Sequence, residues 1–136
     1  MEAITRSLGG RAVRLEGVDR ATYHAAAVLA SNDVVALAVA ASRAWAQAGP
    51  PAADAPRALA PLIRASADGI SERPLPQALT GPLARGDVDT IKQHLAALAR
   101  DPALADLYRQ LALELLTLEL GHSPELRAAL HCALDH

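Results

Sequence analysis

The sequence predicts an all-α protein, a bundle of about five or six helices around one long central helix. Three observations support this fold class. Apolar residues recur with helical spacing through most of the chain, two helix starts carry a capping residue followed by proline, and only one short segment alternates like a strand. The 136 residues are 51% hydrophobic but only 2% aromatic, so we expect a core of closely packed Ala, Leu and Val.

The beginning of the chain differs from the rest. A helix end over Glu2–Leu8 is broken by Gly9 and Gly10, and Arg11–Leu15 then alternates polar and apolar residues. A lone strand has no ladder partner and is not stable by itself. We therefore expect residues 1–16 to be the last helix and strand of a preceding domain. A loosely packed leader is the alternative.

The long central helix is expected from about Arg20 to Gln47, with Asp19 as its cap. Between Ala21 and Ser42 the only formally charged residue is Asp33. The length would allow a membrane span, but the aspartate would then cost about 2.5–3.5 kcal/mol or more at mid-bilayer. We favour a helix buried in a protein core or in a dimer interface, with no membrane partner.

The remaining elements follow in order from local signals. A helix is expected near 55–67, and a Gly- and Pro-rich connection with short helical turns over 69–86. Capping residues then open three more helices, near 87–99, 102–120 and 124–134. The capping residues are Asp87, Asp101 and Ser123, the last two followed directly by proline.

Composition and motifs exclude several functional classes. A net charge of −2 gives no electrostatic footprint for nucleic acid or an anionic membrane. The single Cys132 permits no internal disulfide and suits a reducing cytoplasm, and residues 1–20 are too charged for a signal peptide. No Gly-x-Gly-x-x-Gly or phosphate loop occurs, so we expect no cofactor site in this chain. We expect no metal site among His122, His131 and His136 either, because the neighbouring His131 and Cys132 face different directions on a helix.

Polar residues recur on one face of the long helix. His24, Ser31 and Asn32 are spaced so that an unbroken helix places them on one stripe. Such a stripe can present an acid and a hydrogen-bonding group to a bound carbonyl. The alternative is a core histidine and asparagine that bond to neighbouring backbone, and spacing alone favours that alternative.

A second polar motif lies in the Gly- and Pro-rich connection. Residues 78–87 read Ala-Leu-Thr-Gly-Pro-Leu-Ala-Arg-Gly-Asp. Arg85 is expected to project from a rigid turn beside the helix start that Asp87 caps, which suits a carboxylate or phosphate. The alternative is a joint between two helices with a solvated arginine.

Residues 23–32, together with residues 78–87, resemble the family of domain of unknown function 2520. The resemblance covers about Gly9 to Leu118, and Asp106–Arg109 is similar to the closing helix of that family. It implies a helical domain that follows a Rossmann domain in oxidoreductases, similar to the C-terminal domains of 6-phosphogluconate dehydrogenase and ketopantoate reductase. Residues 1–16 would then be the remnant of the Rossmann domain, and residues 17–136 the substrate and dimerisation domain.

The resemblance also implies roles for residues of the polar stripe. Ketopantoate-reductase-like enzymes carry a catalytic lysine and two asparagines, one and two turns later, on the first long helix. Aligned here, His24 takes the lysine position, Val28 that of the first asparagine, and Asn32 that of the second. His24 and Asn32 are therefore expected as catalytic residues, with Ser31, Thr80 and Arg85 holding the substrate.

Two functions of different classes follow as expectations. The first is half of an enzyme that reduces a small keto or imino acid with NAD(P), the cofactor belonging to a Rossmann domain in the same polypeptide, with a homodimer as the assembly. Such a half would be inactive by itself. The second is a stand-alone helical module for homodimerisation, in which the polar stripe is structural and Ala-rich faces pack closely.

Overall fold

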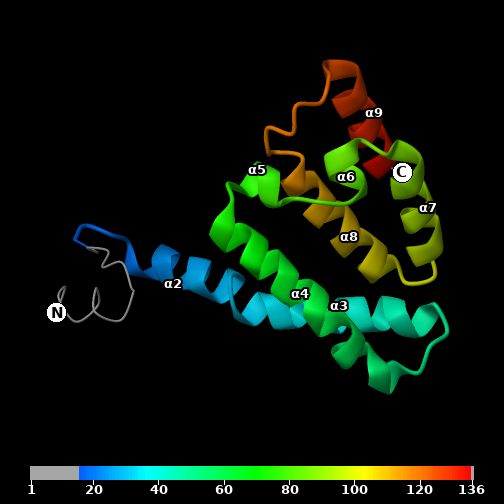
Figure 1. The fold of residues 1–136 in the computed structure, drawn as a ribbon, viewed down its shortest axis with the longest axis horizontal. Helices are drawn as coiled ribbons and strands as arrows, with labels where there is room; N and C mark the ends of the chain where they lie inside the picture. The colour runs from blue at the N-terminus through cyan, green and yellow to red at the C-terminus, as the bar shows by residue number, and fades with distance from the viewer. Residues whose placement is uncertain (1–15, 136) are drawn as a thin grey trace. The chain divides into compact units, whose positions relative to one another are not determined.

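The computed structural model describes residues 16–135, and all regular secondary structure in that part of the chain is helical, which confirms the all-α fold (Figure 1). The helix end, strand and domain remnant predicted before residue 16 lie almost wholly outside the described residues. The chain divides into two compact units, the first ending at Leu37 and the second beginning at Ala38. Each unit is described by itself.

The first unit contains α2, Arg20–Leu29, and the start of α3, Asn32–Gln47. As predicted, Asp19 caps α2: its carboxylate accepts hydrogen bonds from the Ala21 amide at 3.0 Å and the Thr22 hydroxyl at 2.6 Å. No residue of α2 is buried. The expectation that this helix is covered by the chain's own core is therefore wrong for α2.

The single helix expected over this region is divided by a turn at Ala30 and Ser31. The Ser31 amide donates to the Val28 carbonyl at 3.1 Å, and the Ser31 hydroxyl donates to the Ala27 carbonyl at 2.6 Å. A serine that bonds back to the preceding turn competes weakly with the helical ladder, and this bond accompanies the interruption. One continuous ladder therefore does not connect His24 to Asn32.

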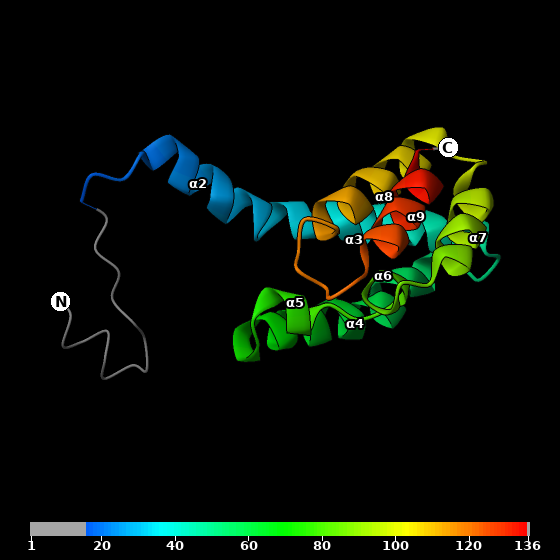
Figure 2. The same cartoon turned by 90° about the horizontal axis from the view of Figure 1, so that it is seen from above.

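The second unit contains the rest of α3 and all later elements. Its core lies among α6 to α9, which pack side by side in both views (Figures 1 and 2). The elements after α3 are a 3₁₀ turn Ala52–Asp54, α4 Ala55–Glu72, α5 Leu75–Ala78, α6 Pro82–Arg85, α7 Val88–Leu98, α8 Pro102–Leu115 and α9 Pro124–Leu134.

Leucine and alanine dominate this core, and Ile91 is its one β-branched residue. The largest fully buried side chains are Ile91 on α7 and Leu130 and Leu134 on α9. The predicted Ala and Leu packing is confirmed, whereas valine is not among the buried residues of residues 16–135. Close packing of branched and small side chains supplies most of the stability of such a unit.

The helix starts predicted from the sequence agree with the structure better than the predicted helix ends do. Asp87, Asp101 and Ser123 each accept a hydrogen bond from the backbone amide three residues later, as predicted. By contrast, α8 ends at Leu115 rather than near 120. There the Thr117 hydroxyl donates to the Glu114 carbonyl at 2.7 Å and competes with the helical ladder.

Helix α4 is longer than predicted and runs on to Glu72 instead of ending near 67. Gly69 lies inside it and is buried. A Cβ added at Gly69 would meet the Ala78 side chain at 3.9 Å, so the neighbouring α5 packs closely on this glycine. Tertiary packing therefore overrides the weak helix propensity of glycine.

Asp101 joins two elements of the second unit. Its carboxylate caps α8 by accepting from the Leu104 amide at 3.1 Å, and it also pairs with Arg43 of α3. The hydrogen bond from Arg43 is the main reason why the pKa of Asp101 lies below its ordinary value of 3.8, with the Leu104 amide second. A carboxyl whose pKa is lowered by folding stabilises the fold above its unfolded pKa, and that stability is lost as pH falls.

We therefore expect Asp101→Asn, which keeps a capping oxygen but loses the ion pair, to destabilise the protein modestly at neutral pH. The difference from wild type should shrink as pH falls below about 4, because protonation removes the same interaction. Urea unfolding at several pH values measures this. Asp106→Asn is the matched control, because Asp106 pairs with Arg109 at 2.8 Å with its side chain 72% exposed. An Asp101 difference that stays constant with pH would contradict the ion-pair account.

Candidate functional site

The polar stripe predicted at the start of the chain lies in the first unit, and its side chains are exposed. His24 on α2, Ser31 in the turn and Asn32 at the start of α3 are all open to solvent. The Ser31 hydroxyl lies 3.3 Å from Asn32 Oδ1. No polar residue within residues 16–135 is buried, so the alternative of a core histidine and asparagine is wrong. The stripe is free to meet a ligand or a partner.

Large apolar side chains are exposed in the same unit. Leu29 is 66%, Val35 65% and Tyr23 53% exposed. By length and composition alone, the run Arg20–Gln47 is apolar enough to cross a membrane, and only 6% of its apolar window is buried. Large apolar side chains that are exposed together along α2 and the start of α3 are unusual for helices that face water without a partner.

The second predicted motif forms a compact turn in the second unit. Thr80 precedes Gly81, whose φ is 90°, and Gly86 ends α6 with φ of 69°. A Cβ added at Gly86 would lie 2.5 Å from Leu126 Cδ2. Both the left-handed backbone and this close approach favour glycine at position 86, which accounts for the turn that the sequence predicts here.

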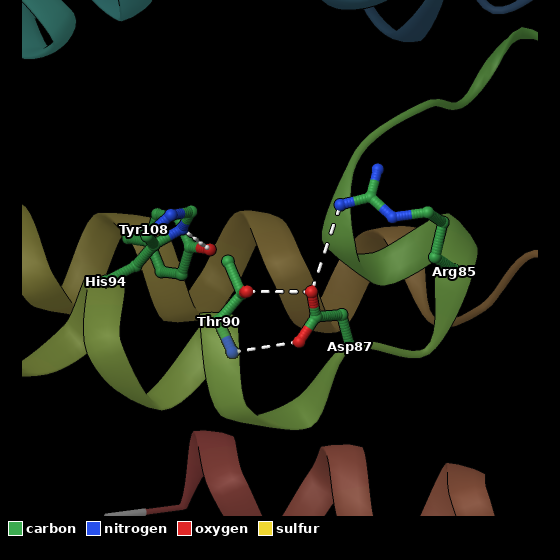
Figure 3. Close-up of polar contacts among 5 residues, drawn as sticks. All are labelled: Arg85, Asp87, Thr90, His94 and Tyr108. Atoms are coloured by element: carbon green, nitrogen blue, oxygen red, sulfur yellow. Dashed lines mark hydrogen bonds and ion pairs between the residues drawn. The ribbon is translucent and has the colours of Figure 1, made fainter.

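Arg85 projects from this turn next to the start of α7 (Figure 3). Its Nη2 lies 3.9 Å from Asp87 Oδ2, and its side chain is 65% exposed. The carboxylate of Asp87 is engaged by Thr90, accepting from its hydroxyl at 2.7 Å and its amide at 3.0 Å. These two bonds, with Arg85 as a smaller contribution, hold the pKa of Asp87 below its ordinary value. Most of the Arg85 guanidinium therefore remains open to an anion, as both interpretations of the motif require.

Thr80 lies between two open cavities of the second unit. One, of about 310 Å³, is bounded by α6, α7 and α8; the other, of about 450 Å³, by α4, α5 and α8. They share three lining residues, Leu79, Thr80 and Leu115. Arg85 lines neither cavity. Within this unit, the structure thus places Thr80 at a cavity wall and Arg85 on the adjoining surface.

The smaller cavity carries two residues that sequence reasoning missed. His94 Nδ1 on α7 lies 2.9 Å from the Tyr108 hydroxyl on α8, and the two rings meet edge to face with centroids 5.8 Å apart (Figure 3). Burial raises the pKa of Tyr108 above its ordinary value of 10.0, so the hydroxyl stays protonated at neutral pH. Fourteen residues separate the two side chains, and no local signal relates them; only the packing of α7 against α8 does.

The described residues do not fit a dinucleotide cofactor. Such a cofactor needs a strand, a glycine-rich turn and a helix start for its phosphates, and residues 16–135 contain no strand. The same part of the chain holds no group of three His, Cys, Asp or Glu side chains arranged for a metal ion. His122 is engaged elsewhere, with Nε2 2.7 Å from the Leu83 carbonyl oxygen. His136 lies outside the described residues.

Comparison with known proteins gives one finding. A family model described as Domain of unknown function (DUF2520) matches residues 1–115, which include both polar motifs and the His94–Tyr108 pair. No match is found among the curated proteins or among the solved structures.

Proposed function

Since the chain belongs to the DUF2520 family, a domain of unknown function, we propose that it is the substrate-binding and dimerisation domain of an NAD(P)-dependent oxidoreductase. The substrate is a small keto or imino acid, and the parent enzyme acts in the cytoplasm. The cofactor belongs to a Rossmann domain in the same polypeptide. This role combines the family membership with the similarity that the family's fold implies to the C-terminal domains of 6-phosphogluconate dehydrogenase and ketopantoate reductase.

One observation carries the proposal: α2 and the start of α3 expose polar and apolar side chains together. His24 and Asn32 are open to solvent, as are Leu29 and Val35. An exposed apolar surface is costly in water at about 25 cal/mol per Å². A partner domain that covers the apolar side chains and leaves His24 facing the covered space would explain both kinds of exposure.

The chain's own residues take separate roles in the proposal. His24 donates a proton to the substrate oxygen or nitrogen as the carbonyl or imine is reduced. Asn32 and Ser31 orient the substrate by hydrogen bonds, Thr80 adds a further hydroxyl, and Arg85 binds the substrate carboxylate. NAD(P)H, when bound by the other domain, would supply the hydride.

Loss of NAD(P)H absorbance with a panel of small keto and imino acids tests the proposal. The protein that joins this chain to a Rossmann domain is expected to turn over at least one of these substrates. The 136-residue chain alone is expected to show none, because its described residues do not fit the cofactor. Turnover by the chain alone, or none by the two-domain protein, would contradict the proposal.

A second candidate function is homodimerisation without catalysis. It is favoured by the number of large apolar side chains exposed in the first unit, Leu29 and Val35 above all. Here α2 and α3 of two copies would cover one another, and the polar stripe would have only a structural role.

Leu29→Asp is expected to weaken a dimer formed through this surface by about tenfold or more, because the interface would have to desolvate a charge. Sedimentation equilibrium over a concentration series measures the change. Leu62→Asp is the matched control, since Leu62 on α4 is similarly exposed, at 64% against 66%. Equal effects of the two variants, or a strictly monomeric wild type, would exclude this surface as a dimer interface.

A further inference from the structure

The cavity that contains His94 and Tyr108 is large enough to hold a ligand. Its volume of about 310 Å³ reaches the lower end of the range for small-molecule sites, and the adjoining cavity of about 450 Å³ extends it. The two cavities belong to the second unit and are formed by α4 to α8. Neither includes a residue of the predicted stripe. Thr80, which the proposed function assigns to the substrate, lines both cavities, whereas His94 and Tyr108 have no role in that function.

The walls of the smaller cavity are mainly apolar, and its lining contains no Asp, Glu, Lys or Arg. Leu111, one of its wall residues, is 39% exposed although it is a large apolar side chain on α8. The cavity is open and the His94 side chain is exposed, but the lining offers an ionised ligand group no Asp, Glu, Lys or Arg as a counter-charge. The chemistry of the walls thus selects an uncharged ligand with an apolar body.

The His94–Tyr108 pair provides the polar recognition. With a neutral imidazole the pair carries two hydrogens, and one of them is used in the bond between His94 Nδ1 and the Tyr108 oxygen. In either histidine tautomer, one hydrogen remains to be donated and one lone pair remains to accept. Within residues 16–135, His94 Nε2 has no hydrogen-bond partner. The pair therefore offers one donor and one acceptor on neighbouring rings.

A carboxamide matches this arrangement, because its carbonyl accepts and its N–H donates within one planar group. Thr80 also lines this cavity and brings a further hydroxyl to its wall. We propose that the His94–Tyr108 cavity binds an uncharged carboxamide on an apolar ring or chain, with the amide on the two side chains and the apolar body against Leu79, Leu111 and Leu115. This proposal does not depend on the oxidoreductase role.

Nuclear magnetic resonance titration of the 136-residue chain with benzamide tests the site. Saturable shifts are expected for backbone amides of residues 79–83, α7 and α8. Tyr108→Phe removes the hydroxyl and keeps the ring, and is expected to weaken benzamide binding about fivefold to tenfold, the effect of one hydrogen bond. Tyr23→Phe, the same change on α2 of the first unit, is expected to leave binding unaltered.

Two other probes separate the polar and apolar parts of the proposal. Toluene, which lacks the amide, is expected to bind wild type and Tyr108→Phe equally, and benzoate to bind more weakly than benzamide. His94→Gln tests the second ring, with His131→Gln on α9 as its control. The proposal is overturned if benzamide gives no saturable shifts, if benzoate binds as tightly, or if Tyr108→Phe binds benzamide like wild type while its spectrum shows a folded protein.

Discussion

Leu130→Ala is expected to lower the free energy of unfolding by about 2–5 kcal/mol, the cost of a cavity left by a deleted core leucine. Leu130 lies on α9 with no exposed surface and belongs to the cluster that joins α6, α7, α8 and α9. Ile91 and Leu134 are equally enclosed, so the surroundings have little freedom to collapse into the space. Urea unfolding followed by circular dichroism measures the loss.

Leu62→Ala provides the matched comparison, because Leu62 is 64% exposed on α4 and lies outside the core cluster. Its effect should remain within about 0.5 kcal/mol. A Leu130 effect as small as that of Leu62 would mean that α9 does not complete the core. The fold described for the second unit would then be wrong at its C-terminal helix.

His24→Ala is expected to lower turnover of the two-domain enzyme by about 10²–10⁴-fold, the usual contribution of a general acid. The substitution should leave the free energy of unfolding nearly unchanged, because the His24 side chain is exposed and no residue of α2 is buried. Steady-state kinetics with the best keto or imino acid substrate gives the size of the loss. The loss is expected in kcat, since proton donation belongs to the chemical step.

His131→Ala is the control for removal of an imidazole, since His131 is exposed on α9 in the second unit. It should retain wild-type kinetics. Turnover of His24→Ala at the wild-type level would remove His24 from the catalytic account and leave the dimerisation function as the stronger candidate. A loss confined to KM would instead make His24 a substrate-binding group.

Local sequence signals were sufficient for the fold class and for most helix starts. Asp19, Asp87, Asp101 and Ser123 cap the helices that they were expected to cap. A capping side chain bonds to an amide two or three residues away, so its effect needs no information from elsewhere in the chain. The turn at Gly86 was equally predictable from its residues.

Helix ends and interruptions were less predictable. Ser31 divides the long helix and Thr117 accompanies the early end of α8, although serine and threonine occur within other helices of the chain. The bond from such a hydroxyl to the preceding turn competes weakly with the ladder. The same bond from Ser42 and Ser66 leaves α3 and α4 unbroken, so the residue type alone does not predict an interruption. Tertiary packing, in turn, keeps the buried Gly69 within α4.

The residues of the candidate sites likewise fall into those that local motifs predicted and those that only the tertiary structure revealed. Spacing identified His24, Asn32 and Arg85 as polar groups worth attention, because each belongs to a local motif. Spacing could not predict that the side chains of His24 and Asn32 are exposed. That exposure excluded the alternative of a buried histidine and asparagine in the core. Tyr108 belongs to a segment that resembles the family's closing helix, but no motif relates it to His94; their hydrogen bond exists because α7 and α8 pack together.

By itself, the sequence therefore determined the all-α fold class, most helix starts, the glycine turn and the polar positions His24, Ser31 and Asn32. Only the tertiary structure decided that α2 is left uncovered, that the core lies among α6 to α9, and that His94 and Tyr108 share a cavity wall. The physical reason is the distance along the chain between the residues that interact. Caps and turns depend on bonds within a few residues, whereas burial and cavities depend on side chains that meet only after distant helices have packed.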